Sequence, residues 1–217
     1  MTEAADLRTT RTAYDTVATD YAEILRTELD EKPLDRAMLG SFAELVRGAG
    51  GGPVADLGCG PGRVTAHLRS LGVDAFGIDL SPAMIEVARG RYPGLRFDEG
   101  SMTALDLADH ALTGIVAWYS IIHTPPESLP TIFAEFGRVL TPGGYLLLAF
   151  QVGDERVHLR QGYGHEISLD AYRLAPDRIA DLFARFGFVE HARLVREPER
   201  WEKTPQAYLM ARKPRPE

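Results

Sequence analysis

Residues 54–63, which read Val-Ala-Asp-Leu-Gly-Cys-Gly-Pro-Gly-Arg, decide the fold of this chain. The apolar run over 53–57 predicts a buried strand, and the glycines over 58–62 predict a tight turn into a helix. Such a turn lets backbone N–H groups and the helix N-terminus approach a ligand closely. About 20 residues further on, Asp79 ends a second predicted strand, where a carboxylate can accept hydrogen bonds from both ribose hydroxyls. This combination predicts a nucleoside-binding site at the carboxyl ends of the strands.

The spacing of the glycines distinguishes between classes of nucleotide ligand. A dinucleotide fingerprint needs a third glycine at position 63, but here Gly58, Gly60 and Gly62 are followed by Arg63. No Lys-Ser or Lys-Thr pair follows the turn, so a P-loop is excluded. Asp56, at the end of the first strand, suits a cationic ligand and is unfavourable beside a pyrophosphate. These features disfavour an NAD-dependent reductase, while tight turns without any ligand stay open as an alternative explanation of the glycines.

Outside this stretch, short apolar runs alternate with helical stretches, which is typical of an α/β fold with a mostly parallel sheet. Helices are expected over 13–29, 33–47, 63–71, 81–89, 126–140 and 176–186. Strands are expected over 53–57, 75–78, 95–97, 114–119, 145–150, 188–196 and 206–212, with a turn at 141–144. The stretch 151–172 is longer than a connection needs, and such insertions often carry function. There is no internal repeat or linker, so we expect a single domain over 1–217.

Composition limits the partners of this chain. It has 217 residues and a net charge of −7, whereas affinity for nucleic acid comes from clustered Lys and Arg. Cys59 is the only cysteine, and His158 and His165 have no clear companion ligand, so we expect neither a disulfide nor a metal site. The polar N-terminus and the lack of a long apolar run predict a soluble, cytoplasmic protein without a secretory signal or a membrane span.

Four segments together resemble a known enzyme family. DLGCGPG (56–62), GIDLSPAMIEVAR (77–89), LRFDEGSMTALDL (95–107) and a strand–helix–Pro-Gly-Gly–strand module ending in LLLAF (146–150) look like a class I S-adenosylmethionine-dependent methyltransferase. The similarity covers about residues 12–212. The segment YDTVATDY also resembles the opening helix of small-molecule methyltransferases related to ubiquinone and menaquinone biosynthesis enzymes. The resemblance implies a three-layer, Rossmann-like doubly wound sheet of seven strands, six parallel and the last antiparallel.

The same resemblance implies S-adenosylmethionine as cofactor, with S-adenosylhomocysteine as product. Asp79 would hold the ribose hydroxyls of the cofactor, and Ser101, where the family often has an acidic residue, would accept weakly from the adenine amino group. Cys59 is most simply a small residue of the turn. The residues expected around the cofactor are Asp56, Gly58, Cys59 and Gly60 at its methionine part, Asp79, Leu80 and Met84 at its ribose or adenine, Ser101 and Met102 beside its adenine, and Tyr21 and Tyr119.

Methyl transfer is an in-line displacement, so the enzyme mainly aligns the nucleophile with the methyl group. The tip after the fourth strand, residues 118–123 (WYSIIH), lies where such folds bind substrate. His123 is the candidate general base because its unperturbed pKa lies near neutrality. The alternative is that His123 only caps a helix or packs under the cofactor. Tyr14, Trp118 and His165 are expected at the acceptor, and the helices over 1–48 are expected to form part of a lid and of the acceptor pocket.

Several features bear on the acceptor. Nucleic-acid amino-methyltransferases of this fold carry Asp/Asn-Pro-Pro-Tyr/Phe where this chain has WYSIIH, so we expect a small-molecule acceptor and no nucleic acid. The basic cluster of Arg193, Arg196 and Arg200 is expected to be a solvated face. The acceptor atom, O, N, C or S, stays open, as does the oligomeric state. A protein that binds S-adenosylmethionine without catalysing transfer is the other hypothesis that the sequence leaves.

Overall fold

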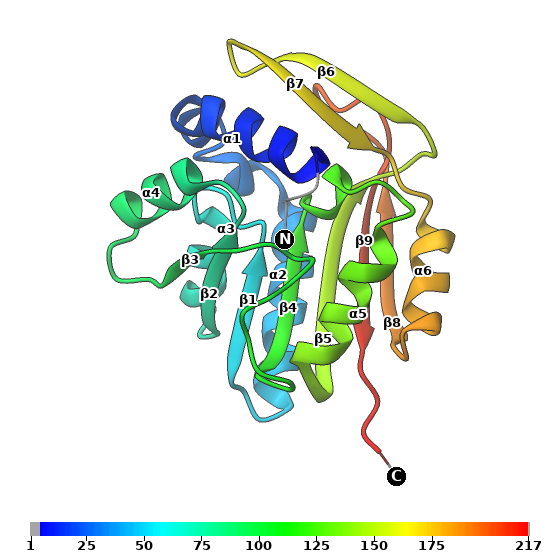
Figure 1. The fold of residues 1–217 in the computed structure, drawn as a ribbon. Helices are drawn as coiled ribbons and strands as arrows, with labels where there is room; N and C mark the ends of the chain where they lie inside the picture. Colours follow the sequence, from blue (N-terminus) through cyan, green and yellow to red (C-terminus); the bar gives the residue numbers. More distant parts are fainter. Residues whose placement is uncertain (1–4, 217) are drawn as a thin grey trace.

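The computed structural model describes residues 5–216 and contains a seven-stranded sheet with the order β3-β2-β1-β4-β5-β9-β8 (Figure 1). Strand β9 is antiparallel to both of its neighbours, and the other six strands run in one direction. The expected Rossmann-like, doubly wound sheet with one antiparallel strand is therefore confirmed. The strands are β1 (Pro53–Leu57), β2 (Asp74–Asp79), β3 (Phe97–Glu99), β4 (Leu112–Trp118), β5 (Leu140–Gln151), β8 (Val189–Arg196) and β9 (Gln206–Arg212).

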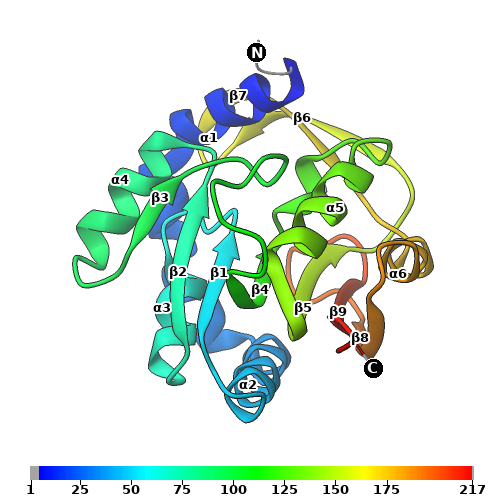
Figure 2. The ribbon, with the colours of Figure 1, turned by 60° about the horizontal axis from the view of Figure 1, so that its bottom comes forward.

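Helices cover both faces of this sheet (Figure 2). Neighbouring strand residues point to opposite faces: Val54 packs with α2 and α3, whereas Ala55 packs with α5 and α6. The core therefore has two apolar layers, one on each side of the sheet. The helices are α1 (Ala5–Ile24), α2 (Pro33–Gly48), α3 (Arg63–Ser70), α4 (Pro82–Arg91), α5 (Leu129–Val139) and α6 (Pro176–Arg185), with short 3₁₀ turns η1 (Glu28–Glu31) and η2 (Ile121–His123).

The stretch 151–172, expected as an irregular connection, is largely a β-hairpin. Strands β6 (Arg156–Gly162) and β7 (His165–Tyr172) pair antiparallel and form a sheet of their own. Tyr163 and Gly164 turn the chain between them with positive φ angles of 54° and 87°. The alternation of apolar and polar residues along both strands is the sequence signal of this hairpin. Its charged and histidine residues obscure that signal.

Two other boundaries differ from expectation. Residues 141–144, expected as a turn, lie within β5 as an irregularity, because the pairing with β4 passes from Leu112–Leu140 directly to Gly114–Tyr145. Helix α1 begins earlier in the chain and ends at Ile24 rather than at residue 29. The longer N-terminal part of α1 matters for the site, because this part extends over the carboxyl ends of the strands.

Helix α1 and the hairpin lie side by side above the carboxyl ends of the central strands (Figure 1). Ile167 of β7 packs against a small apolar cluster of Val17 and Ala18 from α1 and Met84 from α4. At the surface, His165 Nε2 lies 2.6 Å from Asp20 Oδ2, which adds a polar contact between the same two elements. Helix α1 and the hairpin therefore form one roof, assembled from two segments that lie far apart in the chain.

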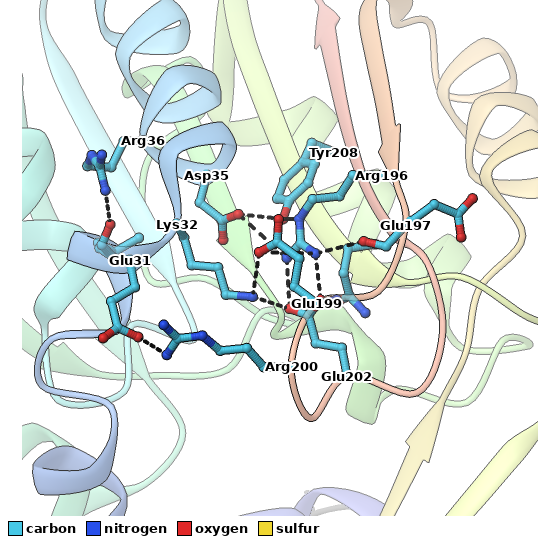
Figure 3. A network of polar contacts seen from close by, with 12 residues as sticks. Glu31, Lys32, Asp35, Arg36, Arg196, Glu197, Glu199, Arg200, Glu202 and Tyr208 are labelled. Carbon is cyan, nitrogen blue, oxygen red and sulfur yellow. Dashed lines mark hydrogen bonds and ion pairs between the residues drawn. The ribbon is translucent and has the colours of Figure 1, made fainter.

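A buried polar network joins α2 to the last two strands of the sheet (Figure 3). Arg196 donates through Nε to the Tyr208 hydroxyl at 3.0 Å and through Nη2 to Glu202 Oε1 at 2.7 Å. Lys32 donates to the same Glu202 oxygen at 2.6 Å, and the Tyr208 hydroxyl donates to Asp35 Oδ1 at 2.7 Å. Arg196 is buried, so the expectation of a solvated basic face is wrong for this residue, because its guanidinium compensates the buried Asp35 and the partly buried Glu202.

The charge of Glu202 is strongly stabilised within this network. Burial alone raises the pKa of Glu202, but hydrogen bonds from Arg196, Lys32 and the Glu199 backbone N–H outweigh it and lower this pKa to about 2. Because the pKa in the folded state lies below the pKa in the unfolded chain, the stabilisation is complete above the unfolded value. It is lost as the pH falls from about 5 towards 2.

We expect Glu202→Gln to lower the free energy of unfolding at pH 7 by about 3 kcal/mol, because it leaves two buried cations without their shared partner. Urea unfolding monitored by circular dichroism measures this difference, which should shrink on acidification to about pH 3. Glu199→Gln is the control, because this more exposed carboxylate lies 3.3 Å from Lys32 and should cost less than about 1 kcal/mol. Equal losses in the two variants would contradict this role of Glu202.

Candidate functional site

A cavity of about 820 Å³, counted with its open mouth, lies between the α1 roof and the carboxyl ends of β1, β2 and β4. It is the place where ligands bind in open parallel sheets, because the helix N-termini and loop N–H groups converge there. Most of the site residues expected from the sequence line this cavity. They are Tyr14, Tyr21, Gly58, Gly60, Asp79, Leu80, Met84, Ser101, Met102, Trp118, Tyr119 and His123.

Asp79 is held by backbone N–H groups at the end of β2. The Gly60 N–H donates to Asp79 Oδ2 at 2.7 Å, and the Ser81 N–H donates to Oδ1 at 2.8 Å. Burial raises the pKa of Asp79 to about 6, although these hydrogen bonds oppose the rise. Each carboxylate oxygen has two lone pairs, so each can accept one further hydrogen bond. The carboxylate is oriented for a ligand that carries two neighbouring hydroxyls.

The two glycines at positions 58 and 60 of the turn have different surroundings. Gly58 has a φ of 72°, and a Cβ at this position would collide with the side chain of Ser120 beyond β4. Gly60 has a φ of 53°, but a Cβ there would meet nothing nearer than Tyr21 at 3.8 Å and Met84 at 4.0 Å. Gly58 therefore packs the turn against β4, whereas Gly60 leaves space on the floor of the cavity.

Asp56, Cys59 and His165, also expected at the site, do not line the cavity. Asp56 is fully buried beneath the turn, where its Oδ2 accepts from the Thr65 hydroxyl at 2.6 Å. Its Oδ1 is buried without a hydrogen-bond partner in residues 5–216, and burial raises the pKa of Asp56 to about 7. Cys59 packs under the turn against Ile85 and has a thiol pKa raised by burial.

His165 lies in the hairpin, where it contacts Asp20 at the surface. The sequence placed it near the acceptor because the whole stretch 151–172 was expected to be a loop. In a strand, side chains alternate between two faces, so His165 shares the inward face of β7 with Ile167, but at the end of this strand it meets Asp20 of α1 outside the cavity lining. Tyr21 lies beneath the hairpin instead, with the Tyr163 ring 4.8 Å from its own.

His123 is connected to both parts of the roof. Its Nε2 lies 2.7 Å from the Tyr14 hydroxyl of α1, and its Nδ1 lies 2.9 Å from the Asp170 carbonyl oxygen of β7. A carbonyl oxygen only accepts, so the proton of the neutral ring is on Nδ1 and Nε2 accepts from Tyr14. Burial lowers the pKa of His123 below its ordinary value, which favours this neutral form.

Tyr119 and Trp118 connect the cavity to the interior of the protein. Tyr119 has a positive φ of 54°, and its hydroxyl lies 3.2 Å from that of Tyr208, a member of the buried network. Trp118 packs edge-on against Tyr119, and its Nε1 is buried without a hydrogen-bond partner in the described part of the chain. The β4 tip therefore presents one oriented phenol and one unpaired indole donor.

The first turns of α1 were missed in the sequence. Leu7, Thr10 and Arg11 also line the cavity, and Arg11 Nε donates to the Leu80 carbonyl at 3.1 Å. They continue the stripe of Tyr14 and Tyr21 at spacings of three and four residues, which places them on the same helix face. A longer helical window would have found them. Ser120, Thr103, Thr124 and Ile132 are further lining residues that the sequence analysis did not name.

Within residues 5–216, no group of three or more His, Cys, Asp or Glu side chains is placed to hold a metal ion. Over the same residues, no helix is both long and apolar enough to cross a membrane.

Comparisons with known proteins agree with this geometry. Residues 54–144 match the methyltransferase domain family. The chain is 32% identical over 120 residues to an uncharacterized methyltransferase of Mycobacterium tuberculosis, which covers 54% of this chain and 47% of that protein. It is 34% identical over 92 residues to the demethylmenaquinone methyltransferase of Chlorobaculum parvum, which covers 42% of this chain and 37% of the relative. The chain therefore spans less than half the length of these relatives.

A solved structure resembles the whole fold. The magnesium protoporphyrin IX methyltransferase of Synechocystis, determined with bound S-adenosylmethionine, superposes with a TM-score of 0.72 at 16% identity and covers 98% of this chain and 99% of that one. At this identity the likeness concerns the fold alone. Together with the match of residues 54–144, it agrees with the resemblance found in the sequence. Residues 54–144 belong to the methyltransferase domain family, and the chain has the fold of the class I S-adenosylmethionine-dependent methyltransferases.

We expect Gly58→Ala to lower the free energy of unfolding by about 2–5 kcal/mol, because it adds left-handed strain and a collision with Ser120. Gly60→Ala is the matched control, with the same strain but open space, and should cost about 1–2 kcal/mol. Urea unfolding of the two variants measures the difference. If both lose the same free energy, close packing against Ser120 is not what requires a glycine at position 58.

Proposed function

We propose that this chain binds S-adenosylmethionine in the cavity under α1 and transfers its methyl group to a small-molecule acceptor. The observation that carries the proposal is the arrangement of Asp79 and the glycine turn at one end of the cavity. Asp79 has two oriented oxygens for the ribose hydroxyls, and Gly60 leaves space beside it. The bound S-adenosylmethionine of the Synechocystis relative supports this choice of cofactor.

The remaining residues fit the other parts of the cofactor. Leu80 and Met84 offer apolar contact to the ribose and adenine, and the Ser101 hydroxyl faces the same cavity beside Met102. The Ser101 hydroxyl is shared with Thr103 at 2.8 Å, so its bond to the adenine amino group is weak in this proposal. The buried, unpartnered Asp56 oxygen beneath the turn suits the positive charge that the methionine part and the sulfonium bring.

The rest of the cavity is assigned to the acceptor. Tyr14, Trp118 and His123 surround the space beyond the cofactor residues, under the roof of α1 and the hairpin. Residues 5–48 and the hairpin therefore belong to the same single domain as the sheet, as a lid and as part of the acceptor pocket. Demethylmenaquinone and magnesium protoporphyrin IX, in the names of two similar proteins, are small molecules, which supports an acceptor of this kind.

Two measurements test the proposal. Isothermal titration calorimetry with S-adenosylhomocysteine and, separately, with NADH distinguishes a methyltransferase from a dinucleotide-dependent reductase. We expect S-adenosylhomocysteine to bind and NADH not to bind. We also expect transfer of radiolabelled methyl from S-adenosylmethionine to members of a metabolite panel. Binding without transfer to any class of acceptor would indicate a binding protein, and binding of NADH alone would contradict the proposal.

We expect Asp79→Asn to weaken S-adenosylhomocysteine binding by about 1.5–3 kcal/mol, or roughly 10- to 150-fold, because a charge-assisted acceptor is lost. The wild-type affinity should also fall as the pH falls through about 6, where Asp79 takes up a proton. This step should be absent in Asp79→Asn, in which the buried Asp56 and His123 still titrate nearby. An unchanged dissociation constant in a folded variant would show that the ribose is held elsewhere.

A further inference from the structure

The candidate base of this site is not directly open to an acceptor. His123 Nε2, the only ring nitrogen that can take up a proton, is covered by the Tyr14 hydroxyl at 2.7 Å. The two rings also meet edge to face, with their centroids 5.2 Å apart. An acceptor in the cavity therefore meets the Tyr14 oxygen before it meets His123.

The direction of this hydrogen bond follows from the hairpin. The Asp170 carbonyl oxygen accepts from Nδ1 and so leaves Nε2 as the acceptor of the ring. Tyr14 must then donate its proton to Nε2, which leaves the lone pairs of the phenol oxygen directed away from His123. These lone pairs are the available acceptors for a proton from a molecule in the cavity.

We propose that Tyr14 and His123 form a proton relay for an acceptor that carries a hydroxyl group. The Tyr14 oxygen takes the proton of the acceptor hydroxyl while its own proton passes to His123 Nε2. Tyr14 is then the residue that touches the acceptor, and His123 is the base behind it. This inference rests on the proposed methyl transfer and narrows its acceptor to phenolic or enolic hydroxyls.

The step balances in atoms and in charge. The acceptor oxygen forms a bond to the methyl carbon as the carbon–sulfur bond breaks, and the electron pair of that bond stays on the sulfur. The acceptor proton replaces the Tyr14 proton, which ends on His123. The single positive charge that enters as a sulfonium remains as an imidazolium, so the buried site gains no net charge. Burial disfavours an isolated imidazolium, but here it replaces another cation nearby.

The chemistry of the pair suits a hydroxyl acceptor better than one that is already ionised. A neutral hydroxyl is a weak nucleophile and gains from a base, whereas a carboxylate or a thiolate arrives already ionised and needs none. Tyr14 cannot serve as a base alone, because burial and the neighbouring Tyr21, Tyr163 and Asp79 raise the pKa of its phenol well above the ordinary value. It stays protonated and can accept a proton only by passing one on.

The surroundings of the pair determine its dependence on pH. Tyr21 of α1, Tyr163 of the hairpin turn and Asp79 of β2 face Tyr14, and Arg11 of α1 also lines the cavity. The Asp170 side chain next to His123 forms an ion pair with Arg156 and lies 2.9 Å from His158 Nδ1 at the surface. The relay operates with a neutral His123, so the rate should fall on acidification, with a midpoint below the ordinary pKa of histidine.

Nuclear magnetic resonance of ¹⁵N-histidine-labelled protein tests the relay without any acceptor. Spectra are recorded for the full chain with and without S-adenosylhomocysteine. We expect a neutral His123 protonated at Nδ1, with an Nε2 resonance that moves in Tyr14→Phe and not in Tyr163→Phe. If His123 of the wild type is protonated at Nε2 instead, the relay is wrong, whether or not S-adenosylhomocysteine binds.

Kinetics with a defined panel test the acceptor class. The methyl donor is radiolabelled S-adenosylmethionine. The acceptors are substituted phenols and, for comparison, benzoates and thiophenols of the same shape. We expect transfer to phenols, with kcat about 100- to 10,000-fold lower in Tyr14→Phe and little change in acceptor KM. Tyr163→Phe, which removes a phenol hydroxyl outside the cavity lining, should stay within about threefold of wild type.

Three results would overturn the inference. They are transfer to benzoates or thiophenols but not to phenols, a Tyr14→Phe variant with wild-type kcat, and an acid limb that persists unchanged in His123→Gln. S-adenosylhomocysteine affinity, measured on the same samples, separates this inference from the proposed function. If the wild type does not bind S-adenosylhomocysteine, the cofactor assignment is wrong. The histidine spectrum recorded without ligand then still shows whether the relay is present.

Discussion

The hydrogen bond from the Gly60 N–H to the Asp79 carboxylate joins the two segments on which the rest of the site depends. It ties the glycine turn after β1 to the end of β2, two strands that already pair in parallel register. Because parallel strands present their carboxyl ends at the same edge, the turn, the acidic strand end and the β4 tip must lie together. The cavity is a consequence of this alignment.

The roof over that edge comes from two distant parts of the chain. Helix α1 precedes the sheet, and the hairpin follows β5. The two elements nevertheless contact each other, and each of them also contacts η2. Tyr14 and Asp170 hold His123 from opposite sides, so the orientation of one imidazole depends on both parts of the roof. A buried network of charges similarly joins α2 to β8 and β9 (Figure 3). The Tyr208 hydroxyl of this network lies 3.2 Å from that of Tyr119, which lines the cavity. Residues that line the cavity therefore contact both the roof and the buried charge network.

Much of the fold was predictable because its signals are local. The strand over 53–57 and the helix that begins at Pro82 are found where expected, since an apolar run, a glycine turn and a Ser81 cap act within a few residues. The hairpin over 156–172 was not predicted, because its strands pair with each other and carry charged residues on their open face. Its place over the cavity depends on packing against α1, which no local pattern encodes.

The sequence by itself determined the sheet, the turn and the chemical types that surround the cofactor space, because the spacing of glycines and carboxylates follows from strand and helix geometry. Only the tertiary structure decided that Asp56 and Cys59 lie beneath the cavity, that Arg196 is buried, and that Tyr14 covers His123. These outcomes depend on contacts between segments far apart in the chain. Such contacts decide which side chains meet, and hence which atom of a histidine can accept a proton.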